Sequence, residues 1–327
     1  MGIACEEDEI DLSVVIPVYN EDANIQLLYS RLVATLEGIP GVGCFEIIFV
    51  ENGSSDGSWG TLRAVIDADT RVRAAKLTRN FGYEMAVTAG LRLSKGRSVV
   101  VMDGDLQDPP ELIPTLWAKK HEGYQHVYAV RARRSESWPK QLAYKAFYSI
   151  LARMSDVAIP LDAGNFAIYD RTVVDVLNAM PEKNRFVRGL RAWTGFRHAG
   201  VPYARDARHL GQTKFSLAAA IGLAADGIFS FSYTPLRMLT VLGFVFAGLS
   251  CAGIAILLGM KLASVIWGLD VVIRGLTVVN VLILLFGGLN LLALGVVGEY
   301  QWRIYDEVKQ RPMYLIERTY PPTESTR

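Results

Sequence analysis

The chain has 327 residues, a net charge of +1 and a hydrophobic content of 51%. This length accommodates a domain of ordinary size together with further helices, and the mean hydropathy of +0.22 is high for a wholly soluble protein. The balanced charge argues against a nucleic-acid partner and against a globally basic surface.

Short apolar stretches alternate with amphipathic helical windows between residues 12 and 131. This alternation is typical of a mainly parallel sheet that is covered by helices on both faces. We expect strands at residues 12–18, 45–50, 72–77, 98–102 and 127–130. We expect helices at residues 24–36, 58–68, 83–93 and 110–121. The sequence therefore predicts an α/β domain within residues 1–213.

Two long uncharged stretches follow in the last third of the chain. Residues 238–260 and residues 275–298 contain no charged side chain. Each stretch exceeds the roughly 20 residues that a helix needs to cross a bilayer. We therefore expect transmembrane helices at residues 236–260 and 275–298, with buried core helices as the alternative.

Residues 214–235 precede these stretches and combine aromatic and aliphatic residues with Asp226 as the one acidic residue. This composition predicts an amphipathic helix in the membrane interface, with a buried core helix as the alternative. The opening residues are acidic and lack an apolar run, so we expect no secretory signal. Basic residues in the tail, residues 299–327, favour a topology with the tail and the N-terminal domain both in the cytosol.

Polar clusters follow four of the expected strands. They occupy residues 17–21, 51–56, 79–82 and 103–105. The loops after parallel strands meet at one edge of an open sheet, although ordinary turn residues would account for part of this pattern. Asp103 and Asp105 stand two residues apart after a buried strand, and such a pair can hold a hard divalent cation against phosphate oxygens. The expected ligand is therefore a nucleotide diphosphate with its metal ion.

Other common sites are not indicated. The chain has no Gly-x-Gly-x-x-Gly after the first strand and no Gly-Lys-Ser of the Walker type, which argues against a dinucleotide cofactor and a P-loop hydrolase. Cys5, Cys44 and Cys251 lack the spacing of metal ligands. We expect all three to be structural thiols.

Four motifs stand in the polar clusters. Residues 14–21 read Val-Val-Ile-Pro-Val-Tyr-Asn-Glu, residues 53–57 read Gly-Ser-Ser-Asp-Gly, residues 79–82 read Arg-Asn-Phe-Gly, and residues 103–110 read Asp-Gly-Asp-Leu-Gln-Asp-Pro-Pro. Together they resemble glycosyltransferase family 2. The closer resemblance is to its polyisoprenyl-phosphate branch, which includes dolichyl-phosphate mannose synthases and bacterial undecaprenyl-phosphate glucosyltransferases. It extends from about residue 12 to residue 317.

The resemblance implies a GT-A fold and transfer of a sugar from a nucleotide sugar to a polyprenyl phosphate, with inversion at the anomeric carbon. It favours UDP-glucose as the donor, and UDP-galactose, a modified aminosugar nucleotide and GDP-mannose are the alternatives. The expected acceptor is undecaprenyl phosphate or a similar lipid. With the two expected spans, the resemblance also implies a homo-oligomeric, multi-pass protein of the bacterial inner membrane whose catalytic domain faces the cytoplasm.

The resemblance assigns residues to the donor site. The implied nucleotide-sugar ligands are Pro17, Tyr19, Glu21, Glu51, Asn52 and Asp103. The implied ligands of Mg²⁺ or Mn²⁺ are Asp103, Asp105 and Gln107, and Asp105 is also assigned to catalysis. In this role the cation acts as a Lewis acid for the departing nucleotide.

This chain departs from the family pattern at two places in the donor site. Family members usually have two aspartates where this chain has Glu51 and Asn52. An Asn side chain offers both a donor and an acceptor, so uracil recognition stays possible. Tyr83 stands where many relatives place Lys, His or Gln.

Basic residues and one further aspartate are assigned to the acceptor side. The implied phosphate ligands are Arg131, Lys140, Arg205, Arg208 and Lys214. Guanidinium groups bind phosphate in a bidentate manner, whereas a solvated basic surface is the alternative. Asp162 begins an Asp-Ala-Gly-Asn-Phe segment that resembles the family element carrying the favoured catalytic carboxylate. A lipid monophosphate is already anionic at neutral pH, so we assign Asp162 as an orienting group or weak base, with turn capping as the alternative.

Two alternative functions are kept. The first is a processive polysaccharide synthase, for which residues 188–193 (Arg-Gly-Leu-Arg-Ala-Trp) only faintly resemble the acceptor signature Gln-x-x-Arg-Trp. The second is a catalytically silent membrane scaffold that binds a nucleotide sugar. A lipid-linked monosaccharide as product would exclude polymerisation, and measurable turnover would exclude the scaffold.

Overall fold

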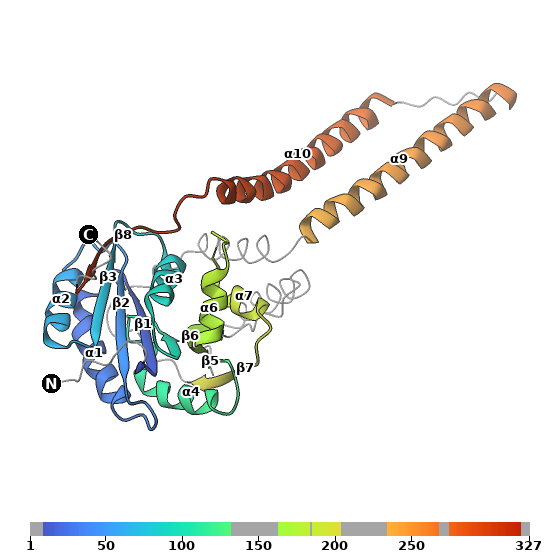
Figure 1. Cartoon of the computed structure of the whole chain (residues 1–327). Helices are drawn as coiled ribbons and strands as arrows, with labels where there is room; N and C mark the ends of the chain where they lie inside the picture. The colour runs from blue at the N-terminus through green and yellow to red at the C-terminus, as the bar shows by residue number, and fades with distance from the viewer. Residues whose placement is uncertain (1–8, 132–162, 184, 204–233, 268–274, 322–327) are drawn as a thin grey trace.

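A mixed β-sheet forms the centre of the protein. The structure, a computed structural model, describes residues 9–131, 163–183, 185–203, 234–267 and 275–321. Among these residues the sheet has eight strands in the order β7-β5-β6-β4-β1-β2-β3-β8 (Figure 1). The strands are β1 (Leu12–Val18), β2 (Phe45–Glu51), β3 (Val72–Leu77), β4 (Ser98–Val101), β5 (His126–Arg131), β6 (Ala163–Asp170), β7 (His198–Tyr203) and β8 (Ile316–Tyr320).

Helices cover both faces of this sheet. The helices that pack on it are α1 (Asp22–Leu36), α2 (Ser58–Ala68), α3 (Tyr83–Leu93), α4 (Ile113–Lys120), α6 (Arg171–Ala179) and α7 (Val187–Trp193), and the short 3₁₀ helix η2 (Pro110–Leu112) precedes α4. Val14 of β1 belongs to the core cluster with α1, α2 and α4, whereas its neighbour Val15 belongs to the cluster with α3, α6 and α7. Because both faces are covered, β1 is buried throughout, and its residues other than Ser13 are apolar rather than alternating with polar ones.

The four central strands are parallel and in close register. β1 pairs with β2 from Leu12 opposite Phe45 to Val18 opposite Glu51, and on its other side β1 pairs with β4. β3 continues the parallel order beyond β2. The loops that follow β1, β2, β3 and β4 therefore leave the sheet at one edge, as the sequence predicts.

The position of α3 relative to this edge is fixed by a close approach to β1. A Cβ atom at Gly90 would lie 2.1 Å from Cγ1 of Val15. Only glycine therefore lets α3 lie this close to β1. At its start, α3 follows Gly82, which has φ of +94°. This left-handed conformation favours glycine, and it places Tyr83 at the carboxyl edge of the sheet.

Three strands and two helices of the domain lie outside the predicted set. β6 inserts between β4 and β5 and is antiparallel to both. The predicted C-terminal tail contributes β8, which pairs antiparallel to β3 and adds an ion pair of 3.0 Å between Lys76 Nζ and Glu317 Oε2. Figure 1 shows the chain returning from α10 (Gly275–Val308) to this edge. The expectation of a free thiol is wrong for Cys44, which is disulfide-bonded.

Two long helices, α9 (Thr234–Trp267) and α10, coincide with the two uncharged stretches. A membrane-crossing helix must be both about 20 residues long and predominantly apolar. No helix within the described parts of the chain meets both requirements. The predicted transmembrane helices are therefore not confirmed, and the predicted multi-pass location in the bacterial inner membrane is wrong on this finding. The expected interfacial helix at residues 214–235 lies almost wholly outside the described residues.

Candidate active site

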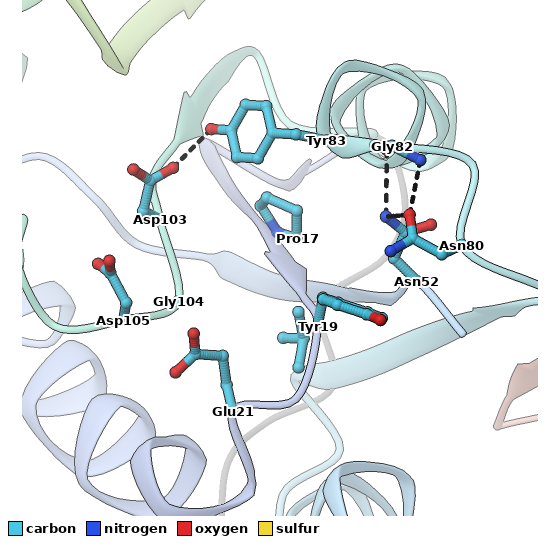
Figure 2. Close-up of a pocket in the computed structure, with 11 residues that line it drawn as sticks. Pro17, Tyr19, Glu21, Asn52, Asn80, Gly82, Tyr83, Asp103, Gly104 and Asp105 are labelled. Carbon is cyan, nitrogen blue, oxygen red and sulfur yellow. Dashed lines mark hydrogen bonds between the residues drawn. The ribbon is translucent and has the colours of Figure 1, made fainter. Parts of the chain in front are cut away.

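A cavity of about 340 Å³ opens at the carboxyl edge of the central strands. Its size is that of a small-molecule site. Figure 2 shows the side chains that line it. They are Pro17, Val18, Tyr19, Glu21, Asn52, Asn80, Gly82, Tyr83, Asp103, Gly104 and Asp105. The structure therefore brings together the residues that follow β1, β2, β3 and β4.

One side of the cavity, here called the acidic edge, is formed by Asp103 and Asp105 after β4. Oδ1 of Asp103 accepts a hydrogen bond of 2.6 Å from the hydroxyl of Tyr83. Oδ1 of Asp105 accepts a bond of 3.2 Å from the backbone N–H of Gln107. Figure 2 shows Glu21 reaching toward the same side of the cavity from the start of α1. Negative charge therefore gathers on this side.

The turn that carries the acidic edge is tight. A Cβ atom at Gly104 would lie 3.1 Å from the carbonyl oxygen of Pro17, so the chain after β4 passes close against β1. Leu106 is buried and has φ of +60°, which is rare for a bulky residue. Such strained backbone tends to occur where the surrounding structure holds functional groups in place. Leu106 directly follows Asp105, which lines the cavity.

The opposite side, here called the amide edge, is formed by Asn52, Asn80 and Gly82. Nδ2 of Asn52 donates to Oδ1 of Asn80 at 3.2 Å and to the carbonyl oxygen of Gly82 at 3.1 Å, while its Oδ1 accepts from the N–H of Phe81 at 3.0 Å. Oδ1 of Asn80 also accepts from the N–H of Gly82 at 2.8 Å. The amide of Asn52 therefore fixes the loop after β3, and its donor and acceptor groups are already engaged.

Backbone geometry completes the amide edge. Gly53 has φ of +71°, and a Cβ atom there would lie 2.5 Å from the backbone of Arg79 and Asn80. Only glycine fits this contact between the loops after β2 and β3. Glu51 is fully buried, accepts a hydrogen bond from the N–H of Ser54, and does not line the cavity. Glu51 thus lies behind the amide edge rather than at its surface.

Tyr19 presents an aromatic ring at the mouth of the cavity. Its exposed fraction is 41%, which is high for a tyrosine that follows a fully buried strand. The next residue, Asn20, has φ of +56°, and its side chain accepts a hydrogen bond of 2.9 Å from the N–H of Ser55. The loops after β1 and β2 are therefore joined, and the exposed ring of Tyr19 is accessible for stacking on a planar ligand.

The start of α3 is electrostatically unusual. Burial and the nearby charge of Asp103 raise the pKa of Tyr83 well above its ordinary value, so its hydroxyl stays protonated and donates. Burial also raises the pKa of Glu84, although Arg188 opposes this shift. Oε2 of Glu84 accepts a hydrogen bond of 3.2 Å from the N–H of Val187 at the start of α7. α3 is thereby tied to α7.

The structure places the predicted site residues unequally. Pro17, Tyr19, Glu21, Asn52, Asp103 and Asp105 line the cavity, and Gln107 lies beside it through its backbone bond to Asp105. Arg131 is the last residue of β5, where it pairs with Tyr203 of β7. Asp162, Lys140, Arg205, Arg208 and Lys214 lie outside the described residues. The roles of all these residues stay predictions.

Five lining residues have no role predicted from the sequence, and two of them, Asn80 and Tyr83, bring a polar side chain to the cavity. Asn80 belongs to the Arg-Asn-Phe-Gly motif, so its motif membership was an available signal. The indication for Tyr83 is weaker, because this position stands out only for differing from the Lys, His or Gln that many relatives have there. Its contact with Asp103 joins residues that are 20 positions apart.

The described residues include no group of three or more His, Cys, Asp or Glu side chains that could hold a metal ion. Two carboxylates with substrate phosphates are nevertheless the usual way in which proteins bind Mg²⁺. Asp103 and Asp105 supply such a pair. The donor set therefore fits a cation that arrives with a diphosphate, and it does not fit a cation held by protein groups alone.

The fold is an α/β fold with a cavity at the carboxyl ends of its central parallel strands, which is where open α/β sheets bind their ligands. Residues 13–177 match the family described as Glycosyl transferase family 2. The chain therefore belongs to glycosyl transferase family 2. The predicted family is confirmed, as are the glycosyltransferase class and the GT-A-like α/β fold with a mostly parallel, mixed sheet.

Similar proteins are found across bacteria. An uncharacterized glycosyltransferase, YkcC, of Bacillus subtilis (strain 168) is 42% identical over 95% of this chain and 94% of its own length. A prophage bactoprenol glucosyl transferase homolog of Escherichia coli (strain K12) is 37% identical over 94% of this chain and 98% of its own length. A crystal structure of glucosyl-3-phosphoglycerate synthase from Mycobacterium tuberculosis, in complex with Mn²⁺, UDP-glucose and phosphoglyceric acid, is 20% identical, with a TM-score of 0.45 over 68% of this chain and 79% of that chain.

Proposed function

We propose that this protein transfers a sugar from a nucleotide sugar to a polyprenyl phosphate, with inversion at the anomeric carbon. The proposed donor is UDP-glucose, and the proposed product is a polyprenyl-phosphate monosaccharide. The observation that carries the proposal is the cavity that the two carboxylates of Asp103 and Asp105 line together with the exposed side chain of Tyr19. The name of the bactoprenol glucosyl transferase homolog, which matches nearly the whole chain, supports the choice of acceptor and sugar.

The acidic edge would serve the diphosphate. Asp103 and Asp105 would hold Mg²⁺ or Mn²⁺, and phosphate oxygens of the donor would complete the coordination. When bound, the cation supplies Lewis-acid stabilisation to the departing nucleotide. Without a cation, the negative charge gathered at this edge would repel a diphosphate. The proposal therefore requires a divalent metal.

The rest of the cavity would orient the nucleoside. The ring of Tyr19 would stack on the base, with Pro17 as the floor beneath it. Asn52 would act indirectly, because its amide is engaged in holding the loop that carries Asn80 and Gly82. Base recognition in this proposal thus rests on the shape of the amide edge rather than on a direct contact with Asn52.

The proposed chemistry is a single in-line displacement. A phosphate oxygen of the acceptor forms a bond to C1 of the sugar while the bond from C1 to the nucleotide diphosphate breaks, and the electron pair leaves with the diphosphate. The acceptor is already anionic at neutral pH, so the protein needs to position it more than to deprotonate it. We propose Asp162 for this positioning, with Arg131, Lys140, Arg205, Arg208 and Lys214 as phosphate ligands.

The test is product identification. Purified full-length protein is incubated with undecaprenyl phosphate, Mn²⁺ and a panel of nucleotide sugars, and the lipid product is analysed by mass spectrometry. We expect one hexose per lipid phosphate, the highest turnover with UDP-glucose, and loss of turnover in excess chelator. A polymeric product would instead indicate a processive synthase, and nucleotide binding without any turnover would indicate a scaffold.

A further inference from the structure

The hydroxyl of Tyr83 lies between two parts of the sheet. It donates a hydrogen bond of 2.6 Å to Oδ1 of Asp103, which follows β4. The side chain of Asn165, on β6, lies near the same hydroxyl and acts on its pKa in the direction opposite to Asp103. A phenol can donate one hydrogen bond and accept others, so the hydroxyl that donates to Asp103 can also accept from this amide. Figure 2 shows the ring of Tyr83 extending over the cavity to Asp103.

The tyrosine cannot easily move away from this position. Its ring packs against the core cluster beneath α3. The preceding residue, Gly82, is held through both its N–H and its carbonyl oxygen by the amide edge. The following residue, Glu84, accepts a hydrogen bond from the start of α7. The two residues that flank Tyr83 are therefore fixed by separate elements.

Its second partner is equally well anchored. Asn165 lies on β6, one residue after Gly164, whose carbonyl oxygen accepts a hydrogen bond of 3.2 Å from Nη2 of Arg191. Arg191 is only 1% exposed, and its Nη1 donates to the hydroxyl of Tyr169, also on β6. β6 in turn pairs with β4, the strand that leads into Asp103. The contact through Tyr83 closes this arrangement at the cavity.

We propose that Tyr83 is a positioning residue that holds the donor-side carboxylate of Asp103 in one orientation and links it to Asn165 on β6. The inference rests on the proposed function, because it gives Asp103 a role toward the metal and the diphosphate. A hydrogen bond to a charged carboxylate is of the stronger kind. Outer-shell partners of this kind fix the orientation of the groups that bind a metal.

The test begins with Tyr83→Phe, which removes one oxygen atom and keeps the ring in the core. Binding of UDP in the presence of Mn²⁺ is measured by calorimetry on the full-length protein, and kcat and KM are measured separately. We expect binding to weaken by about ten- to hundredfold, the usual range for loss of an outer-shell partner. Binding of UDP with excess chelator should change much less, since Asp103 acts through the cation.

The matched control is Tyr29→Phe. The hydroxyl of Tyr29 also donates to an aspartate, Oδ2 of Asp69, at 2.8 Å, and both residues lie outside the cavity. Tyr29→Phe therefore removes a hydrogen bond of the same kind, from a tyrosine to an aspartate, at a site outside the cavity. We expect UDP binding and turnover of this variant to match those of the wild type.

Two further variants separate positioning from general structure. Tyr83→Gln keeps both a donor and an acceptor, and it should restore Mn²⁺-dependent binding to well above that of Tyr83→Phe. Asn165→Ala should lower turnover in the wild-type background but add little in the Tyr83→Phe background, because its effect passes through the hydroxyl. The glutamine variant also keeps the test valid if the phenylalanine variant does not fold.

The inference is overturned if Tyr83→Phe binds Mn²⁺ and UDP like the wild type, or if its loss equals that of Tyr29→Phe. Additive effects of Tyr83→Phe and Asn165→Ala would overturn the link to β6. These outcomes differ from a failure of the proposed function. If the wild type itself neither binds UDP nor transfers a sugar, the proposed function fails, whereas an active wild type with an unchanged Tyr83→Phe variant removes only this inference.

Discussion

The two sides of the cavity use their polar groups in opposite ways. At the amide edge, Asn52 and Asn80 direct their polar atoms toward the loop after β3 and hold it. At the acidic edge, Asp103 and Asp105 bring negative charge to a cavity wall. Under the proposed function, one side keeps the loops rigid and the other binds a cation with its phosphates. Mutations on the two sides should accordingly differ in whether they change stability or chemistry.

The largest effect is expected at the acidic edge. Asp105→Asn should lower kcat/KM for sugar transfer by about a thousandfold, because the charge stabilisation that a metal supplies is worth several kcal/mol. The urea midpoint of unfolding should stay close to that of the wild type. Asp67→Asn, which changes an exposed aspartate on α2, serves as the control and should keep full activity. An Asp105→Asn enzyme with normal turnover would contradict the assignment of this edge.

At the amide edge we expect a substitution to lower the stability of the protein rather than to change its chemistry. Asn52→Ala removes three hydrogen bonds from a residue that is 4% exposed. An intramolecular hydrogen bond contributes about 0.5 to 1.5 kcal/mol net to stability, so the loss of three should lower the free energy of unfolding by about 3 kcal/mol. Urea denaturation followed by circular dichroism measures this change. If stability is unchanged and the variant selectively loses its binding of uridine nucleotides, Asn52 instead contacts the base.

The pH dependence of stability should arise away from both edges, at His126 on β5. This side chain is 2% exposed, and its ring lies 5.1 Å from that of His198. Burial and the charge of Arg191 lower the pKa of His126 to about 3 from an ordinary value of 6.5. The folded state therefore binds fewer protons than the unfolded chain below pH 6.5, so stability is full above that pH and falls as the pH falls toward 3.

Between pH 7 and pH 5 we expect the free energy of unfolding to fall by about 2 kcal/mol, since each pKa unit corresponds to about 1.4 kcal/mol. Urea unfolding at both pH values measures this difference. In His126→Phe the difference should shrink, whereas His121→Phe, which changes an exposed histidine, should preserve it. An unchanged pH dependence in His126→Phe would show that another group is responsible.

The sequence predicted the central strands well because burial on both faces makes most of their residues apolar. β1 and β4 fall within about one residue of the expected ranges, and with them Asp103 and Asp105 reach the cavity. β7 and β8 were missed because almost none of their residues is fully buried, so no apolar run marks them. β6 was missed although it is buried, since it enters the sheet out of chain order between β4 and β5.

The orientation of side chains was less predictable than the position of strands. Asn52 was expected to face a base, but its partners come from a loop about 30 residues further along the chain. The bond between Tyr83 and Asp103 likewise depends on the packing of α3 against β1. The membrane prediction rested on the length and apolarity of two uncharged stretches and on the basic tail, and no helix among the described residues is long and apolar enough to confirm it. Pairing of polar groups over such distances is decided by the tertiary structure.

The most direct test of the account is a crystal structure of the full-length protein with Mn²⁺ and UDP. The account predicts that the cation lies between the diphosphate and the carboxylates of Asp103 and Asp105, with the uracil ring against Tyr19. It also predicts that Asn52 keeps its bonds to the loop after β3. A nucleotide bound elsewhere, or a cavity that stays empty in crystals of an active enzyme, would contradict the central claim.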